Sequence, residues 1–150
     1  MPLTSSATAT WQGDLPTGTG TVSSASSSNW SDLPTSWRAR TEEQGGQTNP
    51  EELLAAAHAS CFSMAFANQL AKAGFPPQRL DVRADVTGDK RDPGWTVLAS
   101  HLTVRAQVPD VDEETFRTAA NNAKEGCPIS RALKGNVEVT LDATLEPTQA

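Results

Sequence analysis

The chain has 150 residues, of which 37% are hydrophobic and 20% charged, and its formal net charge at pH 7 is -6. This length predicts a single domain, residues 1–150, that buries about two-thirds of its unfolded surface. An acidic chain lacks the clustered Lys and Arg that a nucleic-acid partner requires, and no apolar run approaches the roughly 18 residues that cross a bilayer. The first residues show neither the basic start nor the apolar stretch of a secretory signal, which predicts a cytoplasmic protein.

Segments with period-two character predict N-terminal strands over about residues 7–43. The segments "TATWQG" and "GTGTVS" flank a predicted turn, and "SWRARTEE" has the alternation of a third strand. Between them, "SSASSSNWSDLPTS" (23–36) is rich in serine and predicts a surface loop. The expected N-terminal unit is a meander of about three strands.

A long helix is predicted over about residues 50–73. Asn49 is a favourable N-cap, Pro50 fits the first helical position, and Glu52 completes a capping box. Gly74 ends the helix. Because apolar and small side chains surround the helix on all sides, the pattern predicts a buried helix, which a small chain could cover across a dimer interface.

The remainder, about residues 79–145, predicts further strands and a C-terminal helical part. "RLDVRADVTGD" and "WTVLASHLTVRAQV" alternate and are joined by a hairpin loop. An amphipathic helix over Asp112–Lys124, a short helix that starts at Cys127 and Pro128, and a final strand "NVEVTLDATL" follow. Together these elements predict an α+β fold with antiparallel strands at both ends and a buried central helix.

The chain contains only two cysteines, Cys61 and Cys127. In a reducing compartment such a pair suits redox chemistry or a metal better than a permanent disulfide. Cys61 lies in the middle of the long helix, where apolar surroundings raise a thiol pKa and favour an inert core residue. Cys127 precedes a helix N-terminus, a position that lowers a thiol pKa. The residues alone therefore do not decide which thiol would attack a substrate.

A fixed cation near Cys61 would favour its thiolate form. Arg38 and Arg40 lie on the same face of the expected strand, and an inward arginine needs a carboxylate partner. Glu51 is roughly 80° around the helix axis from Cys61, whereas Glu52 is about 180° away. Glu51 is therefore the better partner of the arginine.

A metal site is an alternative that uses the same thiols. His58 lies three residues before Cys61 on the helix, and the two could bind a metal together with Cys127. The chain offers no fourth ligand and no Cys-x-x-Cys pair beside them. A histidine among alanines is more often a core or interface residue, so we expect no metal; His101, in a strand, is expected to be structural.

Several stretches together resemble the OsmC/Ohr family of hydroperoxide-reducing proteins. They are "TNPEELLAAAHASCFSMAF" around Cys61 and "AKEGCPISRALKGNVEVTLD" around Cys127, together with the spacing between them. "WQGDLPTGTGTVS" near the start resembles the osmotically inducible (OsmC) branch more than the organic-hydroperoxide-resistance branch. The resemblance extends from about residue 8 to residue 145.

The resemblance implies a thiol peroxidase that reduces organic hydroperoxides and hydrogen peroxide in oxidative and osmotic stress defence, without metal, haem or flavin. Cys61 resembles the peroxidatic cysteine, whose sulfenate condenses with the resolving Cys127 to a disulfide that an external dithiol, for example of the lipoyl type, reduces. Glu51 resembles the residue that orients the catalytic arginine. For that arginine, Arg40 fits best and Arg38 is the alternative.

The resemblance also implies an intertwined homodimer, in which antiparallel sheets wrap around long central helices and the active sites lie at the dimer interface. Two other functions remain open at this point. One is a thiol redox sensor that uses the same disulfide chemistry. The other is a non-catalytic protein that binds apolar ligands, in which both cysteines are structural and unreactive.

Overall fold

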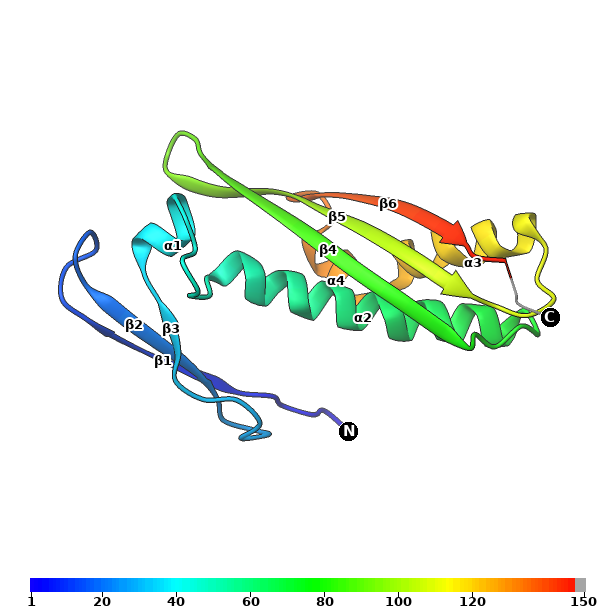
Figure 1. Ribbon diagram of the computed structural model, residues 1–150, viewed down its shortest axis with the longest axis horizontal. Helices are drawn as coiled ribbons and strands as arrows, with labels where there is room; N and C mark the ends of the chain where they lie inside the picture. Colours follow the sequence, from blue (N-terminus) through cyan, green and yellow to red (C-terminus); the bar gives the residue numbers. More distant parts are fainter. Residues whose placement is uncertain (148–150) are drawn as a thin grey trace. The chain divides into compact units, whose positions relative to one another are not determined.

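A computed structural model describes residues 1–147 of the chain (Figure 1). The chain forms two units, Met1–Leu53 and Leu54–Ala150. The first unit contains three strands, one short helix and the first residues of the long helix, and the second contains the rest of that helix with three more strands and two more helices.

Three antiparallel strands form the sheet of the first unit: β1 (Ala7–Gln12), β2 (Thr19–Ser24) and β3 (Leu33–Thr35), in that order. The first two are the strands that the alternating segments predict. The serine-rich stretch 23–36 is not only a loop, because it contains the end of β2 and all of β3. Every residue of β1 is exposed in the single chain.

The segment "SWRARTEE" is a helix and not the third strand that its alternation predicts. Helix α1 (Trp37–Thr41) begins after Ser36, whose Oγ accepts a hydrogen bond from the amide of Ala39 at 3.0 Å. A serine N-cap satisfies an amide that the first helical turn would otherwise leave unpaired. In a segment of five helical residues this local cap outweighs a short period-two pattern.

Helix α2 (Pro50–Lys72) begins as predicted, with Asn49 Oδ1 accepting a hydrogen bond from the Glu52 amide at 2.8 Å. The Glu52 carboxylate accepts a hydrogen bond from the Thr48 hydroxyl at 2.7 Å. Burial on all sides is wrong for the single chain, because Met64 is 70% exposed. The buried stripe recurs every fourth residue, at His58, Phe62, Phe66 and Leu70.

The sheet of the second unit has the order β4-β5-β6 (Figure 1). β4 (Arg79–Lys90) and β5 (Trp95–Gln107) form the predicted antiparallel hairpin. β6 (Glu138–Leu145) pairs with β5 in parallel, so the expected antiparallel arrangement is wrong for this strand. The reason is the connection, since helices α3 (Glu113–Gly126) and α4 (Pro128–Leu133) carry the chain back to the end where β5 starts.

The core of the second unit lies between its helices and its sheet. β5 contributes alternate residues, and α3 contributes the stripe that its amphipathic pattern predicts. The Phe66 ring lies 5.6 Å from Phe62 and 5.4 Å from Phe116, measured between ring centroids. Cys127 is part of this buried cluster, and Cys61 packs against it. In the described part of the chain, no helix combines the length and the apolar character needed to cross a membrane.

Candidate active site

Arg40 and Glu51 form an ion pair inside the first unit. Nε of Arg40 donates to both carboxylate oxygens of Glu51, at 3.0 and 3.3 Å. The Glu51 side chain is buried and that of Arg40 is 30% exposed. Asn49 holds the two helices that carry them together, because its Nδ2 donates to the buried carbonyl of Ala39 at 2.8 Å. The pairing of Glu51 with an arginine is therefore as the sequence predicts.

Arg38 takes a different direction from Arg40. Two residues in a helix are separated by about 200° around its axis, so the same-face relation expected of a strand is lost. Arg38 is 70% exposed and lies near Glu42 and Glu43, at 3.5 and 3.8 Å. Of the two arginines that the sequence left as alternatives, only Arg40 contacts Glu51 in the structure.

An apolar pocket of about 310 Å³ lies within the first unit, beside Arg40. Its apolar wall comes from strands, a turn and both helices: Ala9, Trp11, Leu15, Val22, Trp37 and Leu53. Gly20 shapes this wall, because a Cβ there would come within 2.6 Å of the Trp11 ring. The hydrogen bonds from Arg40 to Glu51 are donated by Nε, and the same arginine side chain lines the pocket.

The two thiols meet in the second unit. Cys61 on α2 is partly exposed and Cys127 at the start of α4 is buried, and both are free thiols. The two side chains lie close enough that each shifts the pKa of the other. The N-cap position of Cys127 is as predicted, although its side chain makes no standard capping hydrogen bond. The fold thus brings together two cysteines that are distant in the sequence.

The surroundings of the two thiols shift their pKa values in opposite directions. Burial and the hydrogen bond with Cys127 raise the pKa of Cys61. Burial also opposes ionisation of Cys127, but the amide and hydroxyl of Ser130 and the Cys61 thiol outweigh it and lower the pKa of Cys127. Within the second unit, negative charge is therefore favoured on Cys127, where the N-terminal turn of α4 stabilises it.

His58 is fully buried and both its ring nitrogens contact hydroxyl groups. Nδ1 lies 2.6 Å from Ser100 Oγ on β5, and Nε2 lies 2.8 Å from Ser130 Oγ on α4. Burial lowers the pKa of His58, so the imidazole is neutral. Both nitrogens are thus already occupied, and the residues 1–147 hold no group of three His, Cys, Asp or Glu side chains that could bind a metal ion. His101 contacts Thr140 Oγ1 at 2.6 Å, in keeping with a structural role.

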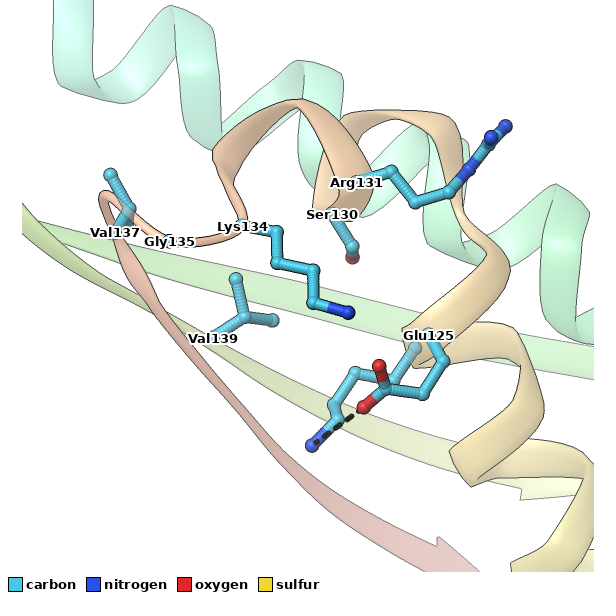
Figure 2. Close-up of a pocket in the computed structure, with 8 residues that line it drawn as sticks. Glu125, Ser130, Arg131, Lys134, Gly135, Val137 and Val139 are labelled. Atoms are coloured by element: carbon cyan, nitrogen blue, oxygen red, sulfur yellow. Dashed lines mark ion pairs between the residues drawn. The ribbon is translucent and has the colours of Figure 1, made fainter.

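A second pocket, of about 170 Å³, lies over α4 and β6 (Figure 2). Lys134 points toward it, and at its rim Lys124 and Glu125 form an ion pair at 3.8 Å. Ser130 of α4 lines this pocket, and its hydroxyl also contacts His58. Sequence reasoning missed Ser100 and Ser130, because a lone serine in a strand or a short helix carries no signal of its partner.

Comparison with known proteins finds relatives that match most of the length of the chain. Residues 43–142 match the OsmC family, described as OsmC-like protein. Peroxiredoxin OsmC of Escherichia coli is 44% identical over 136 residues, which cover 91% of this chain and 92% of that protein. Organic hydroperoxide resistance protein OhrB of Bacillus subtilis is 34% identical over 110 residues, with 69% and 74% covered.

Solved structures agree with these sequence relatives. The crystal structure of OhrB from Bacillus subtilis is similar with a TM-score of 0.67 and 25% identity, covering 93% of this chain and 98% of that one. An organic hydroperoxide resistance protein from Elizabethkingia anophelis has the same fold, with a TM-score of 0.71 over 97% of this chain and 100% of that one. The chain therefore belongs to the OsmC family, and its sequence is nearer to the OsmC relatives than to the Ohr relatives among them.

Proposed function

We propose that the protein is a cysteine-based peroxidase that reduces organic hydroperoxides, and also hydrogen peroxide, to alcohol or water in oxidative and osmotic stress defence. The observation that carries this function is the side-chain contact between the free thiols of Cys61 and Cys127. The names of the relatives, a peroxiredoxin and organic hydroperoxide resistance proteins, support the same reaction.

The proposed cycle has three steps. The Cys61 thiolate attacks one oxygen of ROOH, the O–O bond breaks, and ROH leaves after taking up one proton, while Cys61 becomes a sulfenic acid. Cys127 attacks the sulfenate sulfur, forming the Cys61–Cys127 disulfide and releasing water. An external dithiol then reduces this disulfide by two thiol exchanges and is itself oxidised to a disulfide.

Arg40 is the group that we propose to activate Cys61. Within the second unit the surroundings raise the pKa of Cys61 and lower that of Cys127, so a Cys61 thiolate that attacks the peroxide needs a cation that reverses this order. We propose that Arg40, oriented by Glu51, faces Cys61 in the assembled protein. Complete ionisation of a thiol that is a few per cent thiolate at pH 7 raises its rate only about 30-fold. Most of the acceleration must therefore come from donors such as Arg40 aimed at the leaving oxygen.

The pocket beside Arg40 supports an organic substrate. Its wall is mainly apolar, with the charged group of Arg40 at one side. A hydroperoxide with an apolar R group matches this arrangement, since the R group would lie against the wall and the peroxide oxygens near the guanidinium. The apolar wall gives hydrogen peroxide nothing to bind, which predicts a preference for organic hydroperoxides.

We further propose an intertwined homodimer whose interface completes the active sites. All of β1 is exposed in the single chain, including Trp11 at 42%. Met64 and small residues such as Ala57 and Ser60 leave one side of α2 uncovered and allow another helix to approach closely. A three-stranded sheet with an exposed strand and a half-exposed helix gains stability when a second copy covers both.

The proposed reaction uses the two thiols and no bound cofactor. An external dithiol, for example of the lipoyl type, would supply the electrons, since an exchange reaction needs only an attacking thiolate. Two free cysteines that must return to the reduced form fit the reducing conditions of the cytoplasm, and we propose that location.

Consumption of cumene hydroperoxide with excess dithiothreitol tests the function. We expect turnover by the native protein and none by Cys61→Ser. Activity that survives in Cys61→Ser but disappears in Cys127→Ser would assign the attack to Cys127. An inactive native protein whose thiols react slowly with alkylating reagents would contradict a peroxidase and favour a protein that binds apolar ligands.

A further inference from the structure

A buried polar chain connects β5, α2 and α4 in the second unit. It runs from Ser100 Oγ to His58 Nδ1 at 2.6 Å and from His58 Nε2 to Ser130 Oγ at 2.8 Å. All three side chains are buried, and His58 and Ser100 have no measurable exposure. A polar group in such a core must be hydrogen-bonded to avoid a large cost, so these contacts hold the side chains in place.

Ser130 extends this chain to Cys127. Cys127 is the N-cap residue of α4, and Ser130 lies in the first turn of the same helix. Both the amide and the hydroxyl of Ser130 interact with the Cys127 sulfur. Figure 2 shows that Ser130 and Arg131 leave the helix in different directions, although they are neighbours in the sequence. Ser130 is thus shared between His58 and Cys127.

The donors and acceptors fit one arrangement when Cys127 is ionised. A thiolate only accepts hydrogen bonds, so the Ser130 hydroxyl must donate its proton to the sulfur. The oxygen of Ser130 then accepts from His58 Nε2–H. Nδ1 of His58 carries no proton in this tautomer and accepts from the Ser100 hydroxyl. The tautomer of His58 is thereby linked to the ionisation of Cys127.

We propose that His58 is a positioning residue for Cys127, whose Nε2–H turns the Ser130 hydroxyl toward the sulfur and so stabilises the Cys127 thiolate. Without that donor, the hydroxyl is free to rotate, and serine hydroxyls in helices commonly turn to a backbone carbonyl one turn earlier. The other groups that act on the thiol pair are the Ile129 amide and Arg131, both on α4, and the two cysteines themselves. Assigning the stabilised thiolate to disulfide formation rests on the proposed function, in which Cys127 attacks the Cys61 sulfenate.

The test measures the ionisation of Cys127 in a Cys61→Ser background, where it is the single thiol and a hydroxyl still replaces the Cys61 donor. Thiolate absorbance near 240 nm is followed against pH; the chain has no tyrosine, so tyrosinate does not interfere. In this background four further variants are compared: His58→Asn, His58→Gln, Ser130→Ala and Ser100→Ala. Asn places its amide near the position of Nδ1, whereas the longer Gln reaches the position of Nε2 and keeps an N–H donor there.

We expect His58→Asn and Ser130→Ala to raise the Cys127 pKa by about one pH unit, because each removes the oriented hydroxyl donor. His58→Gln should leave it within about 0.3 pH unit of the background. Ser100→Ala removes the donor to Nδ1 but keeps the Nε2–H group, so it should raise the pKa by less than His58→Asn does. An unchanged pKa in His58→Asn or in Ser130→Ala would overturn the proposal. Equal shifts in all four variants would also overturn it, since they would indicate general loosening of the core. The readout needs no peroxide, so its failure is distinguishable from failure of the proposed function.

Discussion

Nε of Arg40 donates to both carboxylate oxygens of Glu51, at 3.0 and 3.3 Å, so both oxygens of the carboxylate bind the same N–H of the guanidinium. This contact holds the guanidinium of Arg40 against the carboxylate of Glu51. The same side chain lines the apolar pocket of the first unit. A buried carboxylate therefore orients a cation that borders an apolar space.

Replacement of Arg40 by Ala should slow the reaction with cumene hydroperoxide by about 10²-fold, because the proposed donor to the leaving oxygen and the proposed cation beside the thiolate are both lost. The measurement is the rate of Cys61 oxidation in single-turnover experiments. Arg38→Ala is the matched control, since this exposed arginine lies beside Glu42 and Glu43. Its rate should stay within about two-fold of the native protein. A larger effect of Arg38→Ala than of Arg40→Ala would move the catalytic role to Arg38.

Removal of the second thiol should stop the cycle after one turnover. With one equivalent of cumene hydroperoxide and no reductant, the native protein should lose about 2 Da as the disulfide forms, whereas Cys127→Ser should gain about 16 Da as the sulfenic acid accumulates. Intact-mass spectrometry distinguishes the two products. A native protein that also gains 16 Da would show that Cys127 does not resolve the sulfenate.

The apolar pocket should determine the preference for organic substrates. Trp11→Ala removes a large part of its wall, and we expect kcat/KM for cumene hydroperoxide to fall about 10-fold, as the loss of one to two kcal/mol of apolar contact implies. Activity with hydrogen peroxide should change by less than about two-fold, because it has no R group to bind. An equal loss with both substrates would indicate that Trp11 supports the fold and not the substrate.

Stability should depend on pH through His58. Burial lowers the pKa of His58 in the folded protein, so the unfolded state binds more protons once the pH falls below about 6.5. The folded state therefore loses stability as the pH falls from about 6.5 toward the lowered pKa, and above 6.5 this contribution is constant. Thermal unfolding between pH 7.5 and 5.5, at one protein concentration, should show a larger fall in Tm for the native protein than for His58→Gln. Parallel curves would rule out this linkage.

The aromatic cluster should dominate the stability of the second unit. Phe66 is fully buried between Phe62 and Phe116, and Phe66→Ala should lower the free energy of unfolding by about 3–5 kcal/mol through lost burial and a cavity. Asp85→Ala, on the exposed face of β4 beside Arg83, is the control and should cost less than about 1 kcal/mol. Urea unfolding provides both values, and similar losses in the two variants would contradict this assignment of the core.

Local signals in the sequence determined much of the fold. The Asn49 cap and Pro50 set the start of α2, and the stripe of small residues with Phe116 set α3, because caps and helical periodicity act over a few residues. At α1 the short alternation wrongly predicted a strand, because the serine N-cap starts a helix there. The expectation that Glu51 pairs with an arginine also came from helix geometry and is confirmed by the contact with Arg40.

Contacts between distant segments were decided only by the tertiary structure. The parallel pairing of β6 with β5 follows from the path of two intervening helices, which no local pattern encodes. The same holds for the contact of Cys61 with Cys127 and for the two hydroxyls on His58. Sequence patterns report the conformation and burial of neighbouring residues, whereas the electrostatics of a thiol or an imidazole depend on which side chains the fold brings within a few ångströms.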